Sequence, residues 1–290
     1  MMHVSAVIVA LIALILSLST FLLNFYIFLA IFIFKKIPKK PEMFLIYARF
    51  AIDICYALGN SSNLGYFTLR LLFPEAHVKN LSFFIAWPTF NLGSFRVFLV
   101  FFMTSDRVFA SFFPIYYHKY RSHCPTATIL LLMCAYTVFE QYILFVMCDF
   151  TIDVPSSCMH LGCTVSKCYF EYWLWFEQHG YFSIGLLSLL VCFRFFVWNF
   201  LKKRNNSISR ATKIALLDTF ILFTFDLLPS FLFSHFPAIN FETVGPLSAV
   251  CKNAGFVIES VIICKILLGT RSMVAPSSSN KYTPNREPPI

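Results

Sequence analysis

The chain has 290 residues, of which 58% are hydrophobic and only 13% charged, and its mean hydropathy is +0.72. Soluble domains are close to half apolar and a quarter charged, so this composition excludes a soluble globular protein and indicates a membrane protein. The formal net charge of +9 does not indicate nucleic-acid binding, because the Lys and Arg residues fall in short loops between apolar runs.

Apolar runs, taken in chain order, predict seven membrane-spanning helices. The first run, residues 5–34, is uncharged and longer than the roughly 20 residues that a bilayer requires. It is too long for the core of a signal peptide, so we expect it to remain as the first helix. The seven predicted spans are residues 5–34, 43–67, 82–105, 126–148, 179–201, 214–233 and 247–268.

The segments between the spans complete the predicted organisation. Residues 149–178 form the longest loop and residues 202–213 the most basic one. Residues 269–290 are polar and rich in Pro and Ser, which is typical of a disordered tail. We therefore expect one membrane domain over residues 1–268. We find no internal repeat, which argues against a transporter built from duplicated halves.

The distribution of Lys and Arg predicts the orientation of the chain. The loops after the first, third and fifth spans, together with the tail, hold 15 of these residues, whereas the N-terminus and the other loops hold three. Cytoplasmic loops carry an excess of positive charge. The N-terminus is therefore expected outside the cell and the C-terminal tail in the cytoplasm.

Three ionisable residues lie at a common depth in their predicted spans. Asp53 and Arg96 each lie ten residues from the inner end of a span, and Glu259 lies ten residues before Gly269, or about 15 Å into the membrane. Such groups are costly in lipid and usually face the bundle interior. We predict a carboxylate–Arg–carboxylate cluster that joins the second, third and seventh spans. The alternative is local pairing, as between Arg49 and Asp53 on one helix face.

The third predicted span ends in an acidic–Arg pair on the cytoplasmic side. Asp106-Arg107-Val108 resembles the acidic-Arg-aromatic triplet that ends the third span of rhodopsin-like receptors. That resemblance implies an Arg that is held by its acidic neighbour at rest and contacts the G protein in the active state. The residues expected to contact a G protein are Asp106, Arg107, Tyr117, Lys202, Lys203 and Arg204.

Three cysteines gather in the longest loop, which the predicted topology places outside the cell, where disulfides persist. The residues are Cys158, Cys163 and Cys168. We expect one bridge within the loop, while the third thiol is free or bridges Cys251 or Cys148; the pairing cannot be deduced from spacing. No His with zinc-finger spacing accompanies these cysteines, so no metal site is expected.

Several polar residues lie in the outer halves of the predicted helices, where a receptor's pocket would open. Glu140, Gln141 and Asp226 are either pocket residues or hydrogen-bonding residues between helices. In the sixth span, Pro229 is the expected bending point. The residues expected to be anchors at the membrane surface are Trp173, Trp175, His179 and Tyr181.

Residues 43–268 resemble the nematode serpentine chemoreceptors, most closely class BC. The stretches that carry the resemblance are Phe44–Asp53, Trp87–Arg96, Asp106–Arg121, Cys148–Cys168, Ser209–Leu232 and Val244–Ser260. The family implies an all-α bundle of seven transmembrane helices in the plasma membrane, in sensory cilia of chemosensory neurons. It implies a heterotrimeric G protein, a small environmental or pheromone-like ligand, the lipid bilayer and a second receptor in a dimer as partners.

The chain also departs from the rhodopsin pattern. Its seventh span has no Asn-Pro-x-x-Tyr motif, and no Cys lies between Cys55 and Cys124 to tie the outer end of the third span to the long loop. The resemblance therefore implies the architecture but not a rhodopsin-type switch. We expect neither enzymatic activity nor a cofactor. A ligand-gated channel or small transporter is the alternative function.

Overall fold

The computed structural model describes residues 4–37, 43–120, 126–156, 158, 161–202, 210–229, 232 and 246–268. Within these ranges all regular structure is helical. The seven long helices are α1 (Val4–Phe32), α2 (Phe44–Leu72), α3 (Leu81–Phe112), α5 (Thr126–Tyr142), α6 (Lys167–Lys202), α7 (Arg210–Leu222) and α10 (Leu247–Leu268). The shorter elements are η2 (Pro74–Ala76), α4 (Pro114–Tyr120), the π-turns η4 (Ile143–Met147) and η6 (Phe223–Leu227), and η5 (Leu161–Thr164).

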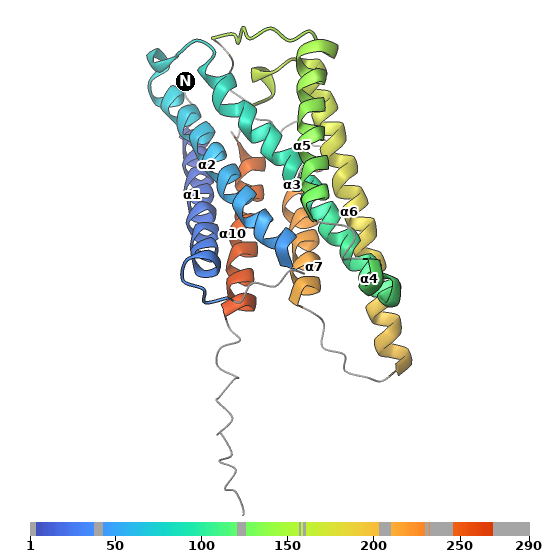
Figure 1. The fold of residues 1–290 in the computed structure, drawn as a ribbon. Helices are drawn as coiled ribbons and strands as arrows, with labels where there is room; N and C mark the ends of the chain where they lie inside the picture. Colours follow the sequence, from blue (N-terminus) through green and yellow to red (C-terminus); the bar gives the residue numbers. More distant parts are fainter. Residues whose placement is uncertain are drawn as a thin grey trace, which may run out of the picture.

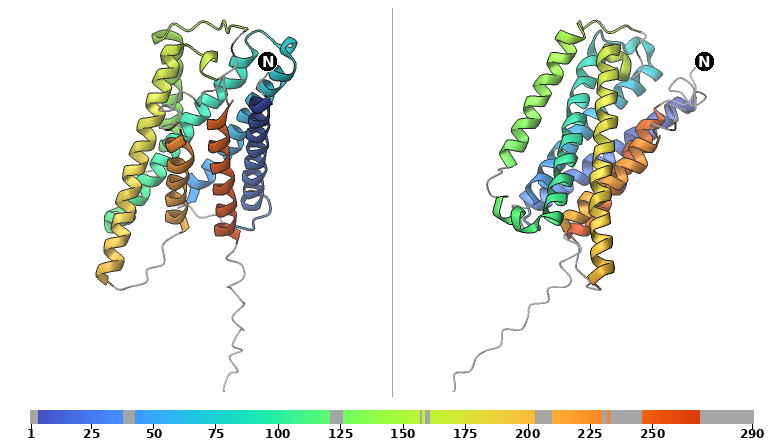
Figure 2. Two further views of the ribbon diagram at one scale, coloured as in Figure 1. Left: turned by 180° about the vertical axis from the view of Figure 1, so that it is seen from behind. Right: turned by 90° about the vertical axis from the view of Figure 1, so that its right-hand side faces the viewer.

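The long helices form one bundle, which confirms the predicted all-α seven-helix architecture (Figures 1 and 2). The helix α1 packs against α2 and α10, and α3 packs against α2, α6 and α7. The connection between α5 and α6 lies at the end of the bundle where α1 begins, which we call the N-terminal end, and α4 lies at the opposite end (Figure 1).

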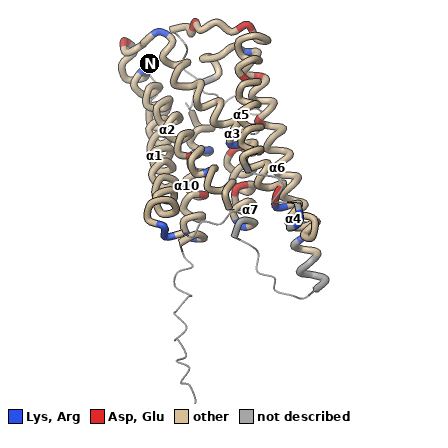
Figure 3. Tube along the Cα trace, viewed as in Figure 1, with Lys and Arg blue, Asp and Glu red and all other residues tan. Residues whose placement is uncertain are grey.

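The bundle places apolar side chains outside and many polar ones inside, as a membrane requires. In the described part of the chain, four helical segments are long and apolar enough to cross a membrane: Ser5–Phe32, Leu81–Phe112, Ala127–Met147 and Leu247–Leu268. Helix α2 carries charged residues in its interior, yet these are buried among neighbouring helices. In Figure 3 several Lys, Arg, Asp and Glu positions lie along the middle of the backbone trace rather than at the ends of the bundle.

Helix ends differ from the predicted span limits at several points. Helix α6 begins at Lys167, twelve residues before the predicted fifth span, and α3 continues to Phe112. Apolar length measures the hydrocarbon thickness, whereas the helical backbone satisfies its own hydrogen bonds and can continue beyond it. Residues 167–178 are therefore helix rather than loop, and the pair Asp106–Arg107 lies within α3.

The backbone of the sixth span is irregular in the half that lies nearer the N-terminal end of the bundle. The π-turn Phe223–Leu227 ends two residues before Pro229, which is buried. Proline has no N–H to donate and its ring crowds the carbonyl four residues earlier, so a regular α-helix is disfavoured at this point. The irregularity thus lies just before the residue expected to bend the helix.

The connection between α5 and α6 is fastened to the bundle by covalent and polar contacts. The structure pairs Cys158 with Cys163 and Cys148 with Cys168. The Arg70 guanidinium donates to the backbone carbonyls of Ser156, at 2.5 Å, and of Cys158. These contacts hold the loop over the C-terminal end of α2, which lies at the N-terminal end of the bundle. Of the alternatives left open for the third loop cysteine, the structure has the one with Cys148.

Candidate functional site

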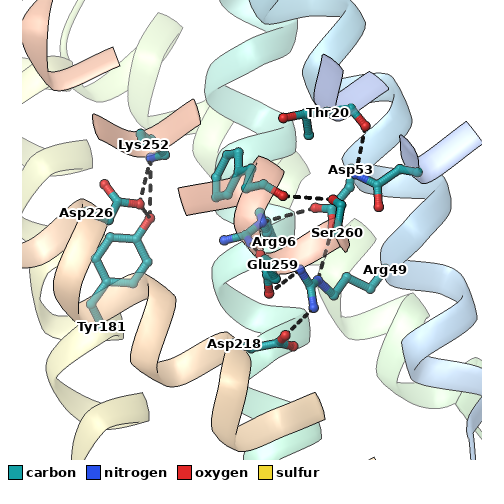
Figure 4. Close-up of polar contacts among 12 residues, drawn as sticks. Thr20, Arg49, Asp53, Arg96, Tyr181, Asp218, Asp226, Lys252, Glu259 and Ser260 are labelled. Atoms are coloured by element: carbon teal, nitrogen blue, oxygen red, sulfur yellow. Dashed lines mark hydrogen bonds and ion pairs between the residues drawn. The ribbon is translucent and has the colours of Figure 1, made fainter. Parts of the chain in front are cut away.

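Five charged side chains form what we call the buried ion cluster, between α2, α3, α7 and α10 (Figure 4): Arg49, Asp53, Arg96, Asp218 and Glu259. On α2, the Arg49 Nε lies 3.1 Å from Asp53 Oδ2. The same guanidinium reaches Glu259 Oε1 at 2.5 Å and pairs with Asp218. One arginine therefore joins three of the helices.

The second arginine of the cluster lies on α3 and contacts two of the same carboxylates. Arg96 Nε is 3.0 Å from Asp53 Oδ1, and Arg96 Nη2 is 3.0 Å from Glu259 Oε2. Its guanidinium also lies 4.1 Å from the ring centre of Phe256, a cation–π contact. Asp53 and Glu259 are thus each shared between two arginines.

The cluster is closed to solvent and holds more carboxylates than arginines. Asp218 has no exposed surface, and the exposed fraction of every member is at most 6%. Buried charges are tolerated only when they are paired, and removing one partner leaves another uncompensated. The cluster is therefore a set of mutually dependent contacts that fixes α2, α3, α7 and α10 relative to one another.

The structure brings together the three residues predicted to share a cluster, and it also contains the local pairing of Arg49 with Asp53. Arg49 and Asp218 belong to the shared cluster but were not predicted as members of it. A signal was present, because Arg49 lies six residues after Met43 and Asp218 four after Ile214, so both are close to the inner ends of predicted spans.

A cavity of about 390 Å³ lies nearer the N-terminal end of the bundle, between α2, α3, α6, η6 and α10. Its walls contain aromatic, amide and hydroxyl side chains. Representative lining residues are Tyr56, Asn60, Asn63, Thr89, Phe170, Trp173, Ser248, Ala249 and Asn253. Sites for small molecules in proteins are commonly of this size and have this mixture of apolar walls and a few polar groups.

Four residues, which we call the cavity ion group, lie at the inner end of the cavity: Glu177, Tyr181, Asp226 and Lys252 (three of them in Figure 4). Lys252 Nζ lies 2.9 Å from Glu177 Oε1 and 3.1 Å from Asp226 Oδ2. The Tyr181 hydroxyl lies 2.7 Å from Glu177 Oε1 and 2.8 Å from Asp226 Oδ2. The three charged members line the cavity.

Glu177 was not predicted as a site residue, because it falls in the segment 149–178 that was expected to be a loop. Trp173 and Tyr181 were predicted to lie at the membrane surface, whereas their exposed fractions are only 8% and 7%. The helix period held the missing signal, since Trp173, Glu177 and Tyr181 are spaced by four residues and share one face of α6.

Of the three residues considered for a pocket, Asp226 alone lines this cavity. Glu140 instead accepts a hydrogen bond from the Ser94 hydroxyl at 2.5 Å, and Gln141 donates to Asn91 at 2.7 Å and accepts from Trp87 Nε1 at 2.8 Å. Of the two roles left open for Glu140 and Gln141, the structure has the hydrogen bonds between helices, since both side chains connect α5 to α3.

The helices α2, α3 and α10, together with the continuous segment of α7 and η6, contribute to both the cavity and the buried ion cluster. On α10, Lys252 and Glu259 are seven residues apart, or two helical turns. Asp226 of η6 lies eight residues after Asp218 of α7, and η6 continues directly from α7. On α2, Tyr56 lines the cavity one turn beyond Asp53. A molecule bound in the cavity would therefore contact the same helices that carry the residues of the buried ion cluster.

The acidic–Arg pair lies at the opposite end of the bundle. The Arg107 guanidinium pairs with the Asp106 carboxylate, and the Tyr117 hydroxyl of α4 lies 3.1 Å from both oxygens of that carboxylate. The exposed fractions of the Arg107 and Asp106 side chains are 12% and 11%. Lys202 ends α6, and Lys203 and Arg204 lie outside the described residues.

Comparison with known families matches residues 2–271 to the serpentine type 7TM GPCR chemoreceptor Srbc family. No curated protein matches the chain. Because the family match spans nearly the whole sequence, the chain belongs to this family, which confirms the resemblance found in the sequence. It is a membrane protein of the GPCR-like chemosensory receptor type. The family gives no support to a channel or transporter.

Proposed function

We propose that this Srbc-family serpentine chemoreceptor binds a small environmental or pheromone-like molecule in the cavity at its N-terminal end and signals to a heterotrimeric G protein at the opposite end. The observation that carries the proposal is the set of helices shared by the cavity and the buried ion cluster. Residence in sensory cilia and assembly with a second receptor stay predictions.

The proposed orientation follows from the charge distribution. The positive-inside rule favours a cytoplasmic location for α4 and for the end of α6, and hence an extracellular location for the cavity. The disulfide-linked loop would then lie outside, where the bridges persist. An epitope tag placed before Met1 is expected to be detected on intact cells. Detection only after permeabilisation would overturn the orientation.

Ligand binding would act by favouring one of two arrangements of the helices. Asp226 is in the cavity and Asp218 in the ion cluster, so a ligand that moves η6 also pulls on the contact between Asp218 and Arg49. Release of that contact would allow α7 and α6 to move outward at the opposite end. The irregular backbone before Pro229 is the expected bending point.

The opposite end would supply the contact with the G protein. At rest, Arg107 is held by Asp106, whose carboxylate also accepts a hydrogen bond from Tyr117. In the proposed active state Arg107 leaves this carboxylate and meets the G protein, together with the basic segment that includes Lys202, Lys203 and Arg204. This assignment of roles rests on the family and on the partly buried pair.

A cavity-filling substitution tests the ligand site. A calcium-reporter screen of volatile and soluble compounds first identifies an activating compound. Ala249→Phe adds an aromatic ring to the cavity lining and is expected to abolish the response to that compound at normal surface level. The control is Ala135→Phe on the exposed face of α5. A full response from the Ala249 variant would show that the ligand binds elsewhere.

A further inference from the structure

The inner end of the cavity holds more carboxyl groups than cations. Lys252 is the cation there, and both Glu177 and Asp226 contact it. The other lining cation, Arg70, lies fourteen residues beyond Tyr56 on α2, about 21 Å along the helix axis. Its guanidinium donates to backbone carbonyls of the disulfide-linked loop. It therefore contributes little to the potential at the inner end.

The neighbouring ion cluster has the same sign of imbalance. It contains three carboxylates and two arginines, and α10 places it two turns from Lys252. Charge is poorly screened in a low-dielectric interior, so an uncompensated carboxylate there attracts a cation strongly. A positively charged group at the inner end of the cavity would balance the second carboxylate of the cavity ion group.

Three buried polar atoms of cavity-lining residues have no hydrogen-bond partner within the described part of the chain: Arg70 Nε, Thr89 Oγ1 and Trp173 Nε1. All three residues are at most 8% exposed, and of the three Trp173 lies closest along its helix to the cavity ion group. An indole N–H can only donate, so it requires an acceptor. Trp173 lies one turn of α6 from Glu177, or about 6 Å along the axis, which sets the spacing between acceptor and cation.

Aromatic walls complete the arrangement. The rings of Tyr56 and Tyr181 already lie 6.0 and 5.9 Å from Lys252 Nζ, and Phe170 and Trp173 line the cavity above them. Aromatic faces stabilise organic cations through their quadrupoles, most strongly when water is excluded. The size of the cavity suits a small organic molecule rather than a bare metal ion.

From the juxtaposition of Glu177, Asp226 and Trp173 in one cavity, we infer that the ligand is a small organic amine, positively charged, which also carries a hydrogen-bond acceptor. Its ammonium group lies against Glu177 and Asp226, and its acceptor receives the Trp173 N–H. The inference rests on the proposed ligand-binding function of the cavity and assigns the chemical class of the ligand.

Binding of three matched probes to the purified full chain in lipid nanodiscs tests the inference. The probes are para-methoxyphenethylamine, which has the cation and the acceptor, para-ethylphenethylamine, which lacks the acceptor, and para-methoxyphenylpropanoate, which is an anion. We expect the methoxy amine to bind about tenfold more tightly than the ethyl amine, because only it accepts the indole N–H. The propanoate is expected not to bind.

Two variants assign the contacts. Glu177→Gln should weaken binding of both amines at least about tenfold, since it removes a charge-assisted contact. Glu171→Gln makes the same change on an exposed stretch of α6, where Glu171 lies 3.7 Å from Lys167, and should leave binding unchanged. Trp173→Phe should remove the preference for the methoxy amine while retaining the ring.

The outcomes separate the ligand class from the ligand site. Equal effects of the Glu177 and Glu171 variants, or no binding of either amine, would overturn the inference. Binding of the propanoate that is lost in Lys252→Gln would overturn the cationic class and leave the cavity as the ligand site. A response that survives Ala249→Phe would instead remove the proposed function itself.

Discussion

Replacing Asp218 with Asn should activate the receptor without ligand. Asp218 is fully buried on α7 and pairs with Arg49 of α2. In the proposed mechanism this contact holds α7 in its resting position, and it must break when α7 moves outward. Asparagine has almost the same size as aspartate but no charge, so the variant weakens the resting contact with little change in packing.

The expected size of this activation depends on the ion pairs that Arg49 keeps in the Asp218→Asn variant. Removing one partner of a buried ion pair costs about 3–5 kcal/mol when the remaining charge is left alone. Arg49 still contacts Asp53 and Glu259, so we take the smaller value of about 1.5–3 kcal/mol for a hydrogen bond to a charged group. Since 1.4 kcal/mol corresponds to about tenfold, the ratio of active to resting receptor should rise about 10- to 100-fold.

The assay is ligand-independent nucleotide exchange on a co-expressed G protein, normalised to the amount of receptor at the cell surface. Asp218→Glu is the control, because it keeps the charge that pairs with Arg49, and its basal exchange should stay closer to that of the unmodified chain. Unchanged basal exchange in Asp218→Asn, at normal surface level and with a normal ligand response, would refute the role of this contact in holding α7.

Three further changes test other parts of the molecule. Arg107→Ala should abolish ligand-evoked signalling at normal surface level, because the proposed G-protein contact is lost. Full signalling by this variant would contradict the proposed contact of Arg107 with the G protein. Cys148→Ser opens a bridge with a sequence separation of 20 and should lower the free energy of unfolding by about 3 kcal/mol in a denaturation assay without reductant, whereas equal stability would mean that the bridge does not constrain the chain. Gly255→Ala should reduce surface level, because a Cβ there would lie 2.6 Å from a side-chain carbon on η6, and overpacking costs about 1–3 kcal/mol. Its control is Gly185→Ala, where a Cβ meets nothing within 4 Å, and equal surface levels of the two variants would argue against close packing at Gly255.

The sequence alone was sufficient for the all-helical seven-span fold and for the family. Apolar runs report burial in lipid, and this signal is local because each helix satisfies its own backbone hydrogen bonds. Depth along a span could also be counted, which is why Asp53, Arg96 and Glu259 were expected together. The side of the membrane on which each loop lies was likewise predicted from charge, and the tag at Met1 tests it.

Rotation and lateral order of the helices could not be read from the chain. Whether Arg49 meets Asp218 depends on α2 and α7 lying across from one another, and hydropathy carries no information about which helices are neighbours. The same limit applies to Glu140, for which the sequence left open a pocket role or a hydrogen bond between helices, and which contacts Ser94 of α3. The choice of Cys148 as the partner of Cys168 also depends on the folded loop.

The cavity ion group shows most clearly which features follow from the sequence and which depend on the packing of the helices. Asp226 and Lys252 are evident in the sequence as ionisable groups in apolar surroundings, and each such group must find a partner in lipid. Only the packing of α6 against η6 and α10 decides that they meet one another, and that Glu177 joins them. Composition and period thus determine which groups must be satisfied inside the membrane, whereas tertiary contacts between helices decide which partners satisfy them.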